Sequence, residues 1–196
     1  MPTGVHIRDA RRQLFEAAER VLLRDGPSAL TSRSVTTEAD CAKGVLHRHF
    51  ADFDEFLAEL VRERITRVGD LAATLRAAAG TGSVQGNLAA ALTDVLDPTA
   101  LAMVSLVFFR DEVRARLRGH GVPVLAEARE MFAAYLAEER ALGRIAADAD
   151  VDNVALSLIG AGHLLFAGRR GGPPPAEEVD RLVATVIADV VQRRLL

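Results

Sequence analysis

The chain has 196 residues, of which 49% are hydrophobic and 26% charged, so it is neither disordered nor collagen-like and forms one domain or two small ones. The formal net charge of −3 at pH 7 argues against a nucleic-acid interface that covers the whole surface. The charge is uneven, however. Residues 1–50 carry eight Lys and Arg against six Asp and Glu, which leaves a mildly basic N-terminal quarter on an acidic remainder.

A single cysteine, Cys41, excludes an internal disulfide and suits a reducing compartment, so we expect a cytoplasmic protein. We expect Cys41 to fill a small apolar position rather than to act as a redox sensor. No signal peptide is predicted at the N-terminus. The longest apolar runs, Ala100–Phe109 and Val154–Ala167, are shorter than the roughly 20 residues that span a bilayer, so we expect no membrane partner.

Helical periodicity runs through nearly the whole chain, and no segment alternates like a strand. Thr31 and Asp52 are expected N-caps, and Gly26 is an expected helix end. The pattern predicts an all-α chain of about nine helices: Ile7–Arg24, Ser32–Ala39, Lys43–His49, a long helix from Asp52, a helix to Leu96, one from Pro98 to about Gly119, Pro123–Leu142, Asp150–Ala167, and a last helix from the Gly171–Pro175 connector to about Arg193.

Residues 31–50 have the pattern of a helix-turn-helix, in which two short helices are joined by a three-residue turn. The second helix of such a motif can enter the major groove of DNA. No acidic residue interrupts Lys43–Phe50, which suits an approach to phosphates, and Gly44 lets a backbone or phosphate come close. We therefore expect DNA contacts from Thr31, Arg33, Lys43, Gly44, Val45, His47 and Arg48.

The order of these features resembles the TetR family of transcriptional repressors over about the first 60 residues. The resemblance rests on the long first helix, Gly26, Thr31, Val35, the run Lys43–Phe50 and the long fourth helix. It implies an N-terminal helix-turn-helix DNA-binding domain, which we place at residues 1–52. A helical effector-binding and dimerisation domain would occupy residues 53–196.

The chain departs from the family pattern at several positions. Asp40 stands where the family usually has glycine in the turn, and Asp is one of the few other residues that tolerate a left-handed backbone. Ala42 replaces a capping serine. His47 and Phe53 replace the tyrosine and lysine that the family uses on phosphate. Either DNA affinity is lowered, or Arg33, Arg48 and the N-terminal arginines supply the missing charge.

The helix Asp150–Ala167 is apolar nearly all round, so it must be covered on more than one side. We expect a symmetric homodimer through this helix and the last one. Its two recognition helices, one from each protomer, would contact a near-palindromic operator. The resemblance also implies a small-molecule effector inside the helical body. We expect an apolar effector site lined by Leu60, Met103, Phe108, Met131, Tyr135, His163 and Phe166, while Glu138–Arg140 has the pattern of a solvent-exposed face.

These features predict a ligand-responsive, DNA-binding regulator, of the repressor type, that a small apolar effector releases from its operator. No nucleotide-binding glycine loop, zinc spacing or nucleophile motif is present, so we expect no enzyme, no catalytic residue, no cofactor and no metal site. One alternative remains open because of His47 and Phe53. The chain could be a helical ligand-binding or interaction protein whose operator binding is weakened or lost.

Overall fold

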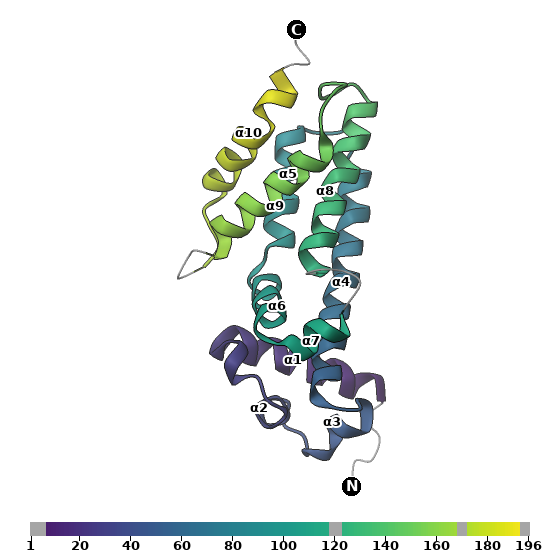
Figure 1. The fold of residues 1–196 in the computed structure, drawn as a ribbon, viewed down its shortest axis with the longest axis vertical. Coiled ribbons are helices and arrows are strands. Elements are labelled where there is room, and N and C mark those ends of the chain that lie inside the picture. The colour runs from purple at the N-terminus through teal and green to yellow at the C-terminus, as the bar shows by residue number, and fades with distance from the viewer. Residues whose placement is uncertain (1–6, 118–122, 168–171, 193–196) are drawn as a thin grey trace. The chain divides into compact units, whose positions relative to one another are not determined.

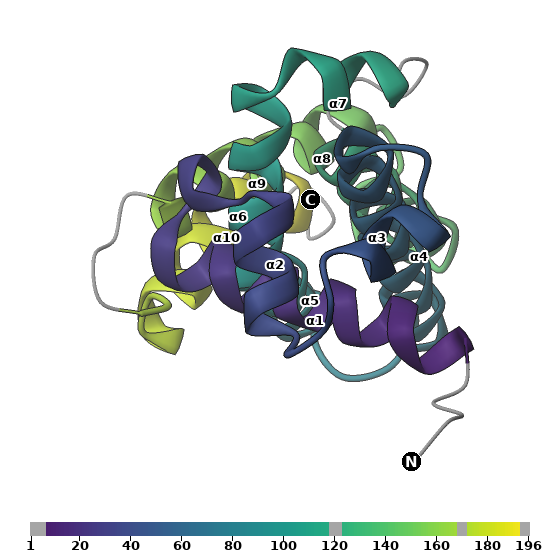
Figure 2. The ribbon, with the colours of Figure 1, turned by 90° about the horizontal axis from the view of Figure 1, so that it is seen from below.

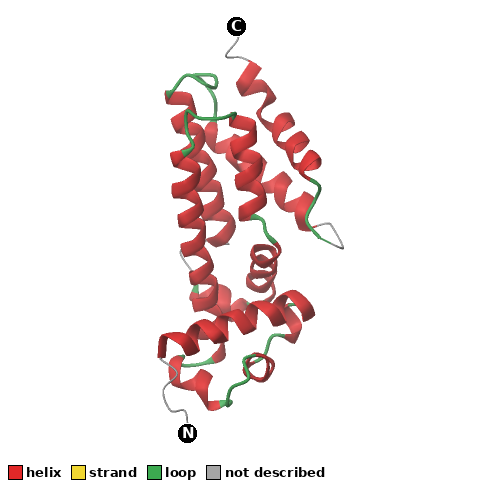
Figure 3. Cartoon of the chain, turned by 180° about the vertical axis from the view of Figure 1, so that it is seen from behind, coloured by secondary structure: helices red, strands yellow, loops and turns green. Residues whose placement is uncertain are grey.

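The structure, a computed structural model, describes residues 7–117, 123–167 and 172–192. Within these ranges it contains helices and loops and no strand, so the predicted all-α class is confirmed (Figures 1 and 3). The helices are α1 (Ile7–Asp25), the short 3-10 helix η1 (Pro27–Ala29), α2 (Ser32–Glu38), α3 (Gly44–His49), α4 (Phe53–Ala77), α5 (Val84–Val95), α6 (Pro98–Phe109), α7 (Asp111–Arg116), α8 (Pro123–Ala141), α9 (Val151–Ala167) and α10 (Ala176–Gln192).

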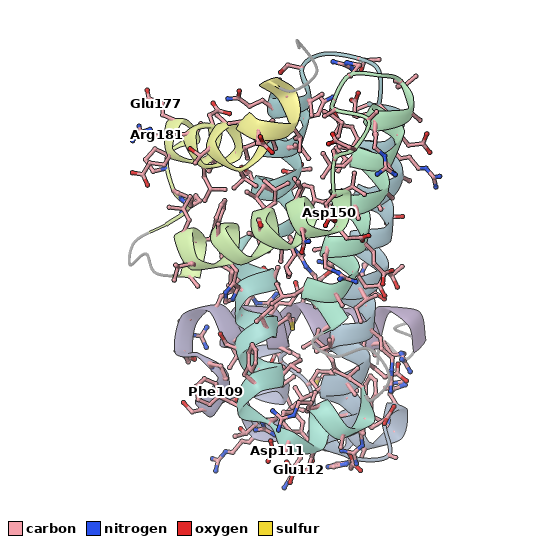
Figure 4. The ribbon with its side chains drawn as sticks, turned by 45° about the horizontal axis from the view of Figure 1, so that its top comes forward. Phe109, Asp111, Glu112, Asp150, Glu177 and Arg181 are labelled. Atoms are coloured by element: carbon pink, nitrogen blue, oxygen red, sulfur yellow. The ribbon has the colours of Figure 1, made fainter. Side chains whose placement is uncertain are left out.

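The helix predicted from Pro98 to about Gly119 is in fact two helices, so the described ranges hold ten α-helices rather than about nine. The chain leaves α6 at Arg110, whose extended backbone (φ −122°, ψ 101°) forms the N-cap of α7. Asp111 and Glu112 occupy the first turn of α7, where acidic side chains favour a helix start. Figure 4 shows both residues beside Phe109 at this break. The predicted end at Gly119 lies outside the described residues.

The chain divides into two compact units. The N-terminal unit comprises residues 1–63 and 102–122, and the C-terminal unit comprises residues 64–101 and 123–196. The division falls within α4 and within α6, so each of these helices contributes residues to both units.

The N-terminal unit is built on α1, against which α2 and α3 pack. Its core contains Leu14, Val21, Leu30, Val35 and Leu46, all at most 1% exposed. The buried residues of α1 repeat at helical spacing (Leu14, Ala17, Ala18, Val21 and Leu22), so one face of this helix is buried.

The C-terminal unit pairs α8 with α9, α5 with α10, and α9 with α10. Its core includes the fully buried side chains of Leu88, Phe132 and Leu158. Gly162 lies where α9 meets α5, and a Cβ atom there would be 2.9 Å from Cδ1 of Leu92 and of Leu96. Replacing this glycine by alanine would require these leucine side chains to shift.

Among the described residues, no single helix is both long and apolar enough to cross a membrane. Helices α5 and α6 meet that test only when taken together, by length and composition alone, and they are bent by 58° at their junction.

Candidate functional site

Helix α2 begins at a reciprocal cap formed by Thr31 and Ser34. The Ser34 amide donates to Oγ1 of Thr31 at 3.1 Å, and the Thr31 amide donates to Oγ of Ser34 at 2.9 Å. The Ser34 hydroxyl also donates to the carbonyl of Ala29 at 2.9 Å. The predicted N-cap is therefore present. It fixes the direction in which α2 leaves the preceding loop.

The turn between α2 and α3 depends on Asp40, which has a left-handed backbone with φ 49°. The Cys41 amide donates to the Thr36 carbonyl at 3.0 Å, which closes the end of α2 around Asp40. Cys41 is half-buried. Burial, together with the nearby Asp40 carboxylate, raises the pKa of the Cys41 thiol. A raised pKa disfavours the reactive thiolate, as expected for a residue that fills space.

An aromatic group holds the end of α3 in place. The ring centroid of Phe50 lies 5.0 Å from that of Phe56 and 5.8 Å from that of Phe15. The guanidinium of Arg11 stands over the Phe50 ring at 4.6 Å, a cation–π contact. Because Phe15 belongs to α1 and Phe56 to α4, the last turn of α3 is packed against both helices.

The predicted DNA-contacting residues belong to α2, α3 and the residues that directly precede these helices, which Figure 2 labels. Leu46 is fully buried, which orients α3. The other predicted residues of this motif are solvent-exposed, except that Val45 is half-buried: Thr31, Arg33, Lys43, Gly44, His47 and Arg48. We call these residues, with Val45, the α2–α3 surface. Gly44 has open space around it, since a Cβ atom there would meet nothing within 4 Å.

Three cations of this surface have no carboxylate partner within residues 7–117, 123–167 and 172–192. Arg33, Lys43 and Arg48 make no ion pair with any residue that the structure describes. Other arginines of the same unit are paired with carboxylates: Arg11 with Glu59, Arg20 and Arg24 with Glu38, Arg62 with Glu55, Arg110 with Asp54, and Arg116 with Asp52. Free cations on an exposed helical surface are suited to bind an external polyanion.

Phe53, at the position where the family resemblance implies a phosphate-binding lysine, has a role inside the protein. It stacks on Phe56 with centroids 5.6 Å apart, and the Arg110 guanidinium lies over its ring at 5.4 Å. Arg110 also pairs with Asp54 at 3.3 Å. The start of α4 is thus held by an aromatic and ionic cluster, and position 53 offers no cation to DNA.

The residues predicted for an effector site are divided between the two units. Leu60, Met103 and Phe108 belong to the N-terminal unit, where Leu60 and Met103 are buried and Phe108 is 55% exposed. The others belong to the C-terminal unit, where all except the half-buried His163 are buried: Met131, Tyr135, His163 and Phe166. Met131 and Tyr135 lie one turn apart on α8, whereas Phe166 lines a separate pocket.

That pocket lies within the C-terminal unit and has a volume of about 550 Å³. Phe166 is the predicted effector residue in its wall. Arg64 and Asp97 form an ion pair in the wall, with Nη2 of Arg64 at 2.5 Å from Oδ2 of Asp97. The pocket is lined by Arg64, Arg67, Val68, Asp70, Leu71, Thr93, Asp94, Asp97, Pro98, Phe166 and Pro173.

Tyr135 belongs to a buried polar cluster that the sequence analysis did not identify. Its hydroxyl donates to Oε1 of Glu139 at 2.6 Å and accepts from Nδ2 of Asn87 at 3.0 Å. Arg144 pairs with Glu139 at 3.3 Å. Glu139 is fully buried, so the prediction that Glu138–Arg140 is a solvent-exposed face is wrong for this residue. The four-residue spacing of Tyr135 and Glu139, which places them on one helix face, is the signal that could have revealed the contact.

Burial, reinforced by the hydrogen bond to Glu139, raises the pKa of Tyr135. The tyrosine hydroxyl is therefore neutral at physiological pH and donates within the protein. Its hydrogen bonds hold α8 against Asn87 of α5, so Tyr135 has a structural role in the described unit.

The chain is similar in sequence to the HTH-type transcriptional regulator PksA of Bacillus subtilis (strain 168), with 36% identity over 76 residues. The match covers 37% of this chain and 37% of the length of that regulator. No protein-family model matches the chain.

Solved structures share the fold over nearly the whole chain. One is a protein from Mesorhizobium loti MAFF303099 assigned to the TetR family of transcriptional regulators, with a TM-score of 0.73, 15% identity, and coverage of 96% of this chain and 98% of that one. A TetR-family regulator from Agrobacterium tumefaciens has a TM-score of 0.70 and 12% identity, and the match covers 96% of this chain and 98% of that one. A third structure, a protein from Saccharomonospora viridis assigned as a transcriptional regulator, was crystallised with choline. It has a TM-score of 0.66 and 19% identity, and the match covers 92% of this chain and 96% of that one.

The chain therefore has the fold of TetR-family transcriptional regulators, with a helix-turn-helix in its N-terminal unit. The resemblance that the first 60 residues indicated is confirmed. The proteins matched above are described as regulators, and none of them as an enzyme.

Proposed function

We propose that the protein is a ligand-responsive transcriptional regulator of the repressor type, which binds a near-palindromic DNA operator in the cytoplasm and is released by a small apolar effector. The observation that carries the proposal is the α2–α3 surface. It holds three cations, Arg33, Lys43 and Arg48, without a carboxylate partner in the described ranges. The helices that carry it are anchored by the buried side chains of Val35 and Leu46. Polyanion binding gives such cations a function.

In this proposal the surface residues have different roles. Arg33, Lys43 and Arg48 neutralise phosphates, which gives affinity without sequence preference. Val45 and His47, on α3, face the base edges of the major groove. Thr31 presents its hydroxyl at the start of α2, and Gly44 leaves room for the DNA backbone to approach.

A homodimer through α9 and α10 is proposed because α9 carries an unpartnered apolar stripe. Leu156, Gly160 and Leu164 follow one another at four-residue intervals, and the two leucines are 54% and 76% exposed. A second copy that covers this stripe would remove it from water and form a four-helix bundle. Two-fold symmetry would then pair two α2–α3 surfaces with two half-sites.

The small-molecule effector is supported by a pocket of about 550 Å³ in the C-terminal unit, within the size range of ligand sites. Its apolar wall includes Val68, Leu71 and Phe166. The fold relative from Saccharomonospora viridis was crystallised with choline, which supports the proposal that a small molecule is bound in this fold.

DNA binding is tested with an operator selected from random duplexes, followed by titrations at several salt concentrations. In the proposed dimer, a Lys43→Ala/Arg48→Ala variant loses two phosphate contacts in each protomer, four in all. The slope of log affinity against log salt should therefore become less steep by about 3.6, since each contact contributes roughly 0.9. Arg129→Ala, which removes an exposed cation of α8, serves as the control and should leave the slope unchanged. An unchanged slope in the double variant would contradict the proposed surface.

The dimer is tested by light scattering on wild type, Leu164→Arg and Leu142→Arg. Leu164 is 76% exposed and Leu142 is 57% exposed, so both substitutions leave the core of the protomer intact. We expect a wild-type dimer, a monomer for Leu164→Arg because an interface would bury an unpaired charge, and a dimer for Leu142→Arg. A wild-type monomer at micromolar concentration would contradict the proposal.

The alternative function, a helical ligand-binding or interaction protein without operator binding, has one observation in its favour. Phe53 is engaged with Phe56 and Arg110 and cannot bind phosphate as a lysine would. Failure to select any preferred duplex from the random pool, in a protein that is dimeric and binds small molecules, would establish this alternative.

A further inference from the structure

The pocket of the C-terminal unit combines an apolar wall with charged side chains. Val68, Leu71 and Phe166 supply apolar surface, and five of the lining residues are charged: Arg64, Arg67, Asp70, Asp94 and Asp97. A purely apolar ligand would have no polar group to offer to these charged side chains. The lining thus points to a ligand that is itself partly polar.

Arg64 is the most unusual of these residues because it is 6% exposed. One side of its guanidinium is neutralised by Asp97, at 2.5 Å. Its Nε atom is buried and has no hydrogen-bond partner among the described atoms. A buried donor without an acceptor is destabilising. The guanidinium of Arg64 is therefore incompletely satisfied within the pocket wall, and an acceptor oxygen of a ligand at its exposed part would add a hydrogen bond that the protein does not supply.

The aspartates of the pocket would bind a donor or a cation, whereas Arg64 would bind an acceptor. Asp97 is engaged, because its Oδ1 accepts from the Ala100 amide at 2.8 Å while Oδ2 pairs with Arg64. Asp70 and Asp94 are exposed, and no described residue pairs with either carboxylate. These two carboxylates favour a cation over an anion at the pocket rim. The ring of Phe166, in the same wall, also favours an ammonium group.

We propose that the pocket binds a small organic cation with an apolar body and one acceptor oxygen, which places its oxygen at Arg64 and its ammonium group at Asp70 and Asp94. The inference rests on the proposed function, since this ligand would be the effector. It adds a charge and a hydrogen-bond acceptor to the apolar effector that the sequence predicts.

The position of the Arg64–Asp97 pair gives the ligand a way to act. Arg64 is a residue of α4, and Asp97 caps the first turn of α6 through the Ala100 amide. Both helices contribute residues to the N-terminal unit as well. A ligand that binds Arg64 therefore contacts the ion pair that joins α4 to the start of α6. It would act as an effector only if it bound one state of the regulator more tightly than the other.

Three matched probes separate the parts of the proposed ligand. L-phenylalaninol carries a phenyl group, an ammonium and a hydroxyl oxygen; 2-phenylethylamine lacks the oxygen; 3-phenylpropan-1-ol lacks the cation. Isothermal titration calorimetry on the full chain, without DNA, should rank L-phenylalaninol as the tightest. We expect it to bind about threefold to tenfold more tightly than either of the other two. Raising the salt to 0.5 M should weaken the two amines and leave the alcohol unchanged.

Variants then assign the contacts. Asp70→Asn/Asp94→Asn should weaken both amines by about tenfold and leave 3-phenylpropan-1-ol unchanged. Glu130→Gln removes an exposed carboxylate of α8 outside the pocket lining and should change none of the three affinities. Arg64→Lys keeps a cation for Asp97 but lacks the remaining donors of the guanidinium, so it should reduce the advantage of L-phenylalaninol over 2-phenylethylamine. Because Asp70 and Asp94 are exposed, the double variant tests the proposal even if Arg64→Lys does not fold.

The proposal is overturned if L-phenylalaninol does not bind at millimolar concentration, if 3-phenylpropan-1-ol binds as tightly, or if the double asparagine variant binds the amines like wild type. Since the titrations contain no DNA, they are independent of operator binding. If the protein binds L-phenylalaninol as expected but selects no operator, the ligand proposal is supported and the regulator proposal is contradicted. If it selects an operator but does not bind L-phenylalaninol, the regulator proposal is supported and the proposed ligand class is contradicted.

Discussion

Nη2 of Arg110 donates a hydrogen bond to the carbonyl oxygen of Leu30 at 2.8 Å. Leu30 lies directly before the α2 cap, and Arg110 stands at the break between α6 and α7. The same guanidinium pairs with Asp54 at 3.3 Å and covers the Phe53 ring. One side chain thus connects three parts of the N-terminal unit that are distant in sequence, and it does so where the chain leaves a helix.

Replacing Arg110 by methionine keeps an apolar stem over Phe53 but removes both polar contacts. We expect the free energy of unfolding to fall by about 1–3 kcal/mol, because the Leu30 carbonyl and the half-buried Asp54 each lose a partner. Urea unfolding measures this change. Arg114→Met removes an exposed pair with Asp111 on one helix and should cost less than about 0.5 kcal/mol. Equal losses in the two variants would show that the Arg110 contacts contribute nothing specific.

Gly44 is predicted to matter only when DNA is bound. Its backbone has no positive φ and a Cβ atom would meet nothing within 4 Å, so Gly44→Ala should not destabilise the free protein and can raise its stability by up to about 1 kcal/mol. A methyl group facing the DNA backbone should nevertheless weaken operator affinity severalfold. Gly69→Ala, in α4 and equally unobstructed, is the matched control for both measurements. If the two alanine variants bind the operator alike, Gly44 does not face the DNA.

The left-handed conformation of Asp40 makes this residue a test of the turn. At φ 49°, glycine would be free of the Cβ strain that aspartate tolerates, so Asp40→Gly should leave stability unchanged or raise it by up to about 1 kcal/mol. A β-branched side chain is poorly suited to this region, and Asp40→Val should lower the free energy of unfolding by about 1–2 kcal/mol. Thermal unfolding of wild type, Asp40→Gly and Asp40→Val measures the order of their stabilities. An Asp40→Val variant as stable as wild type would mean that the turn has another conformation in solution.

Glu38 predicts a pH dependence of stability. Hydrogen bonds from Arg20 and then Arg24, each at 2.8 Å, lower the pKa of Glu38 below the usual value. A carboxyl group whose pKa is lowered by folding stabilises the protein above its unfolded-state pKa of about 4.3, and the contribution is lost as the pH falls through the folded-state pKa. Glu38→Gln should therefore be less stable than wild type at pH 7, and this difference should disappear toward pH 3.

Urea unfolding between pH 3 and pH 7 measures the effect. Glu63→Gln, which removes an exposed carboxylate of α4 without a partner among the described residues, controls for the change in net charge. A stability difference between Glu38→Gln and wild type that stays constant over the whole range would show that the two arginines do not hold Glu38 in its charged form.

The sequence by itself determined the features that depend on near neighbours. The Thr31 cap closes with Ser34, three residues away, and the left-handed turn concerns Asp40 and the residues next to it. The burial of Leu46 beside the exposed His47 and Arg48 follows from helical periodicity alone. The helix-turn-helix was therefore predictable, because its geometry is set within one or two helical turns.

Only the tertiary structure decided the features that join distant residues. The break at Arg110 is held by Asp54 and Leu30, which are 56 and 80 residues away, and the pocket depends on a pair between Arg64 and Asp97, 33 residues apart. Glu139 has buried partners in two loops: the Gly80 amide in the loop after α4 and Arg144 in the loop after α8. A charged residue on a helix has the same local pattern whether it faces water or a partner. The partner that compensates for its desolvation is fixed by packing, which no local spacing reveals.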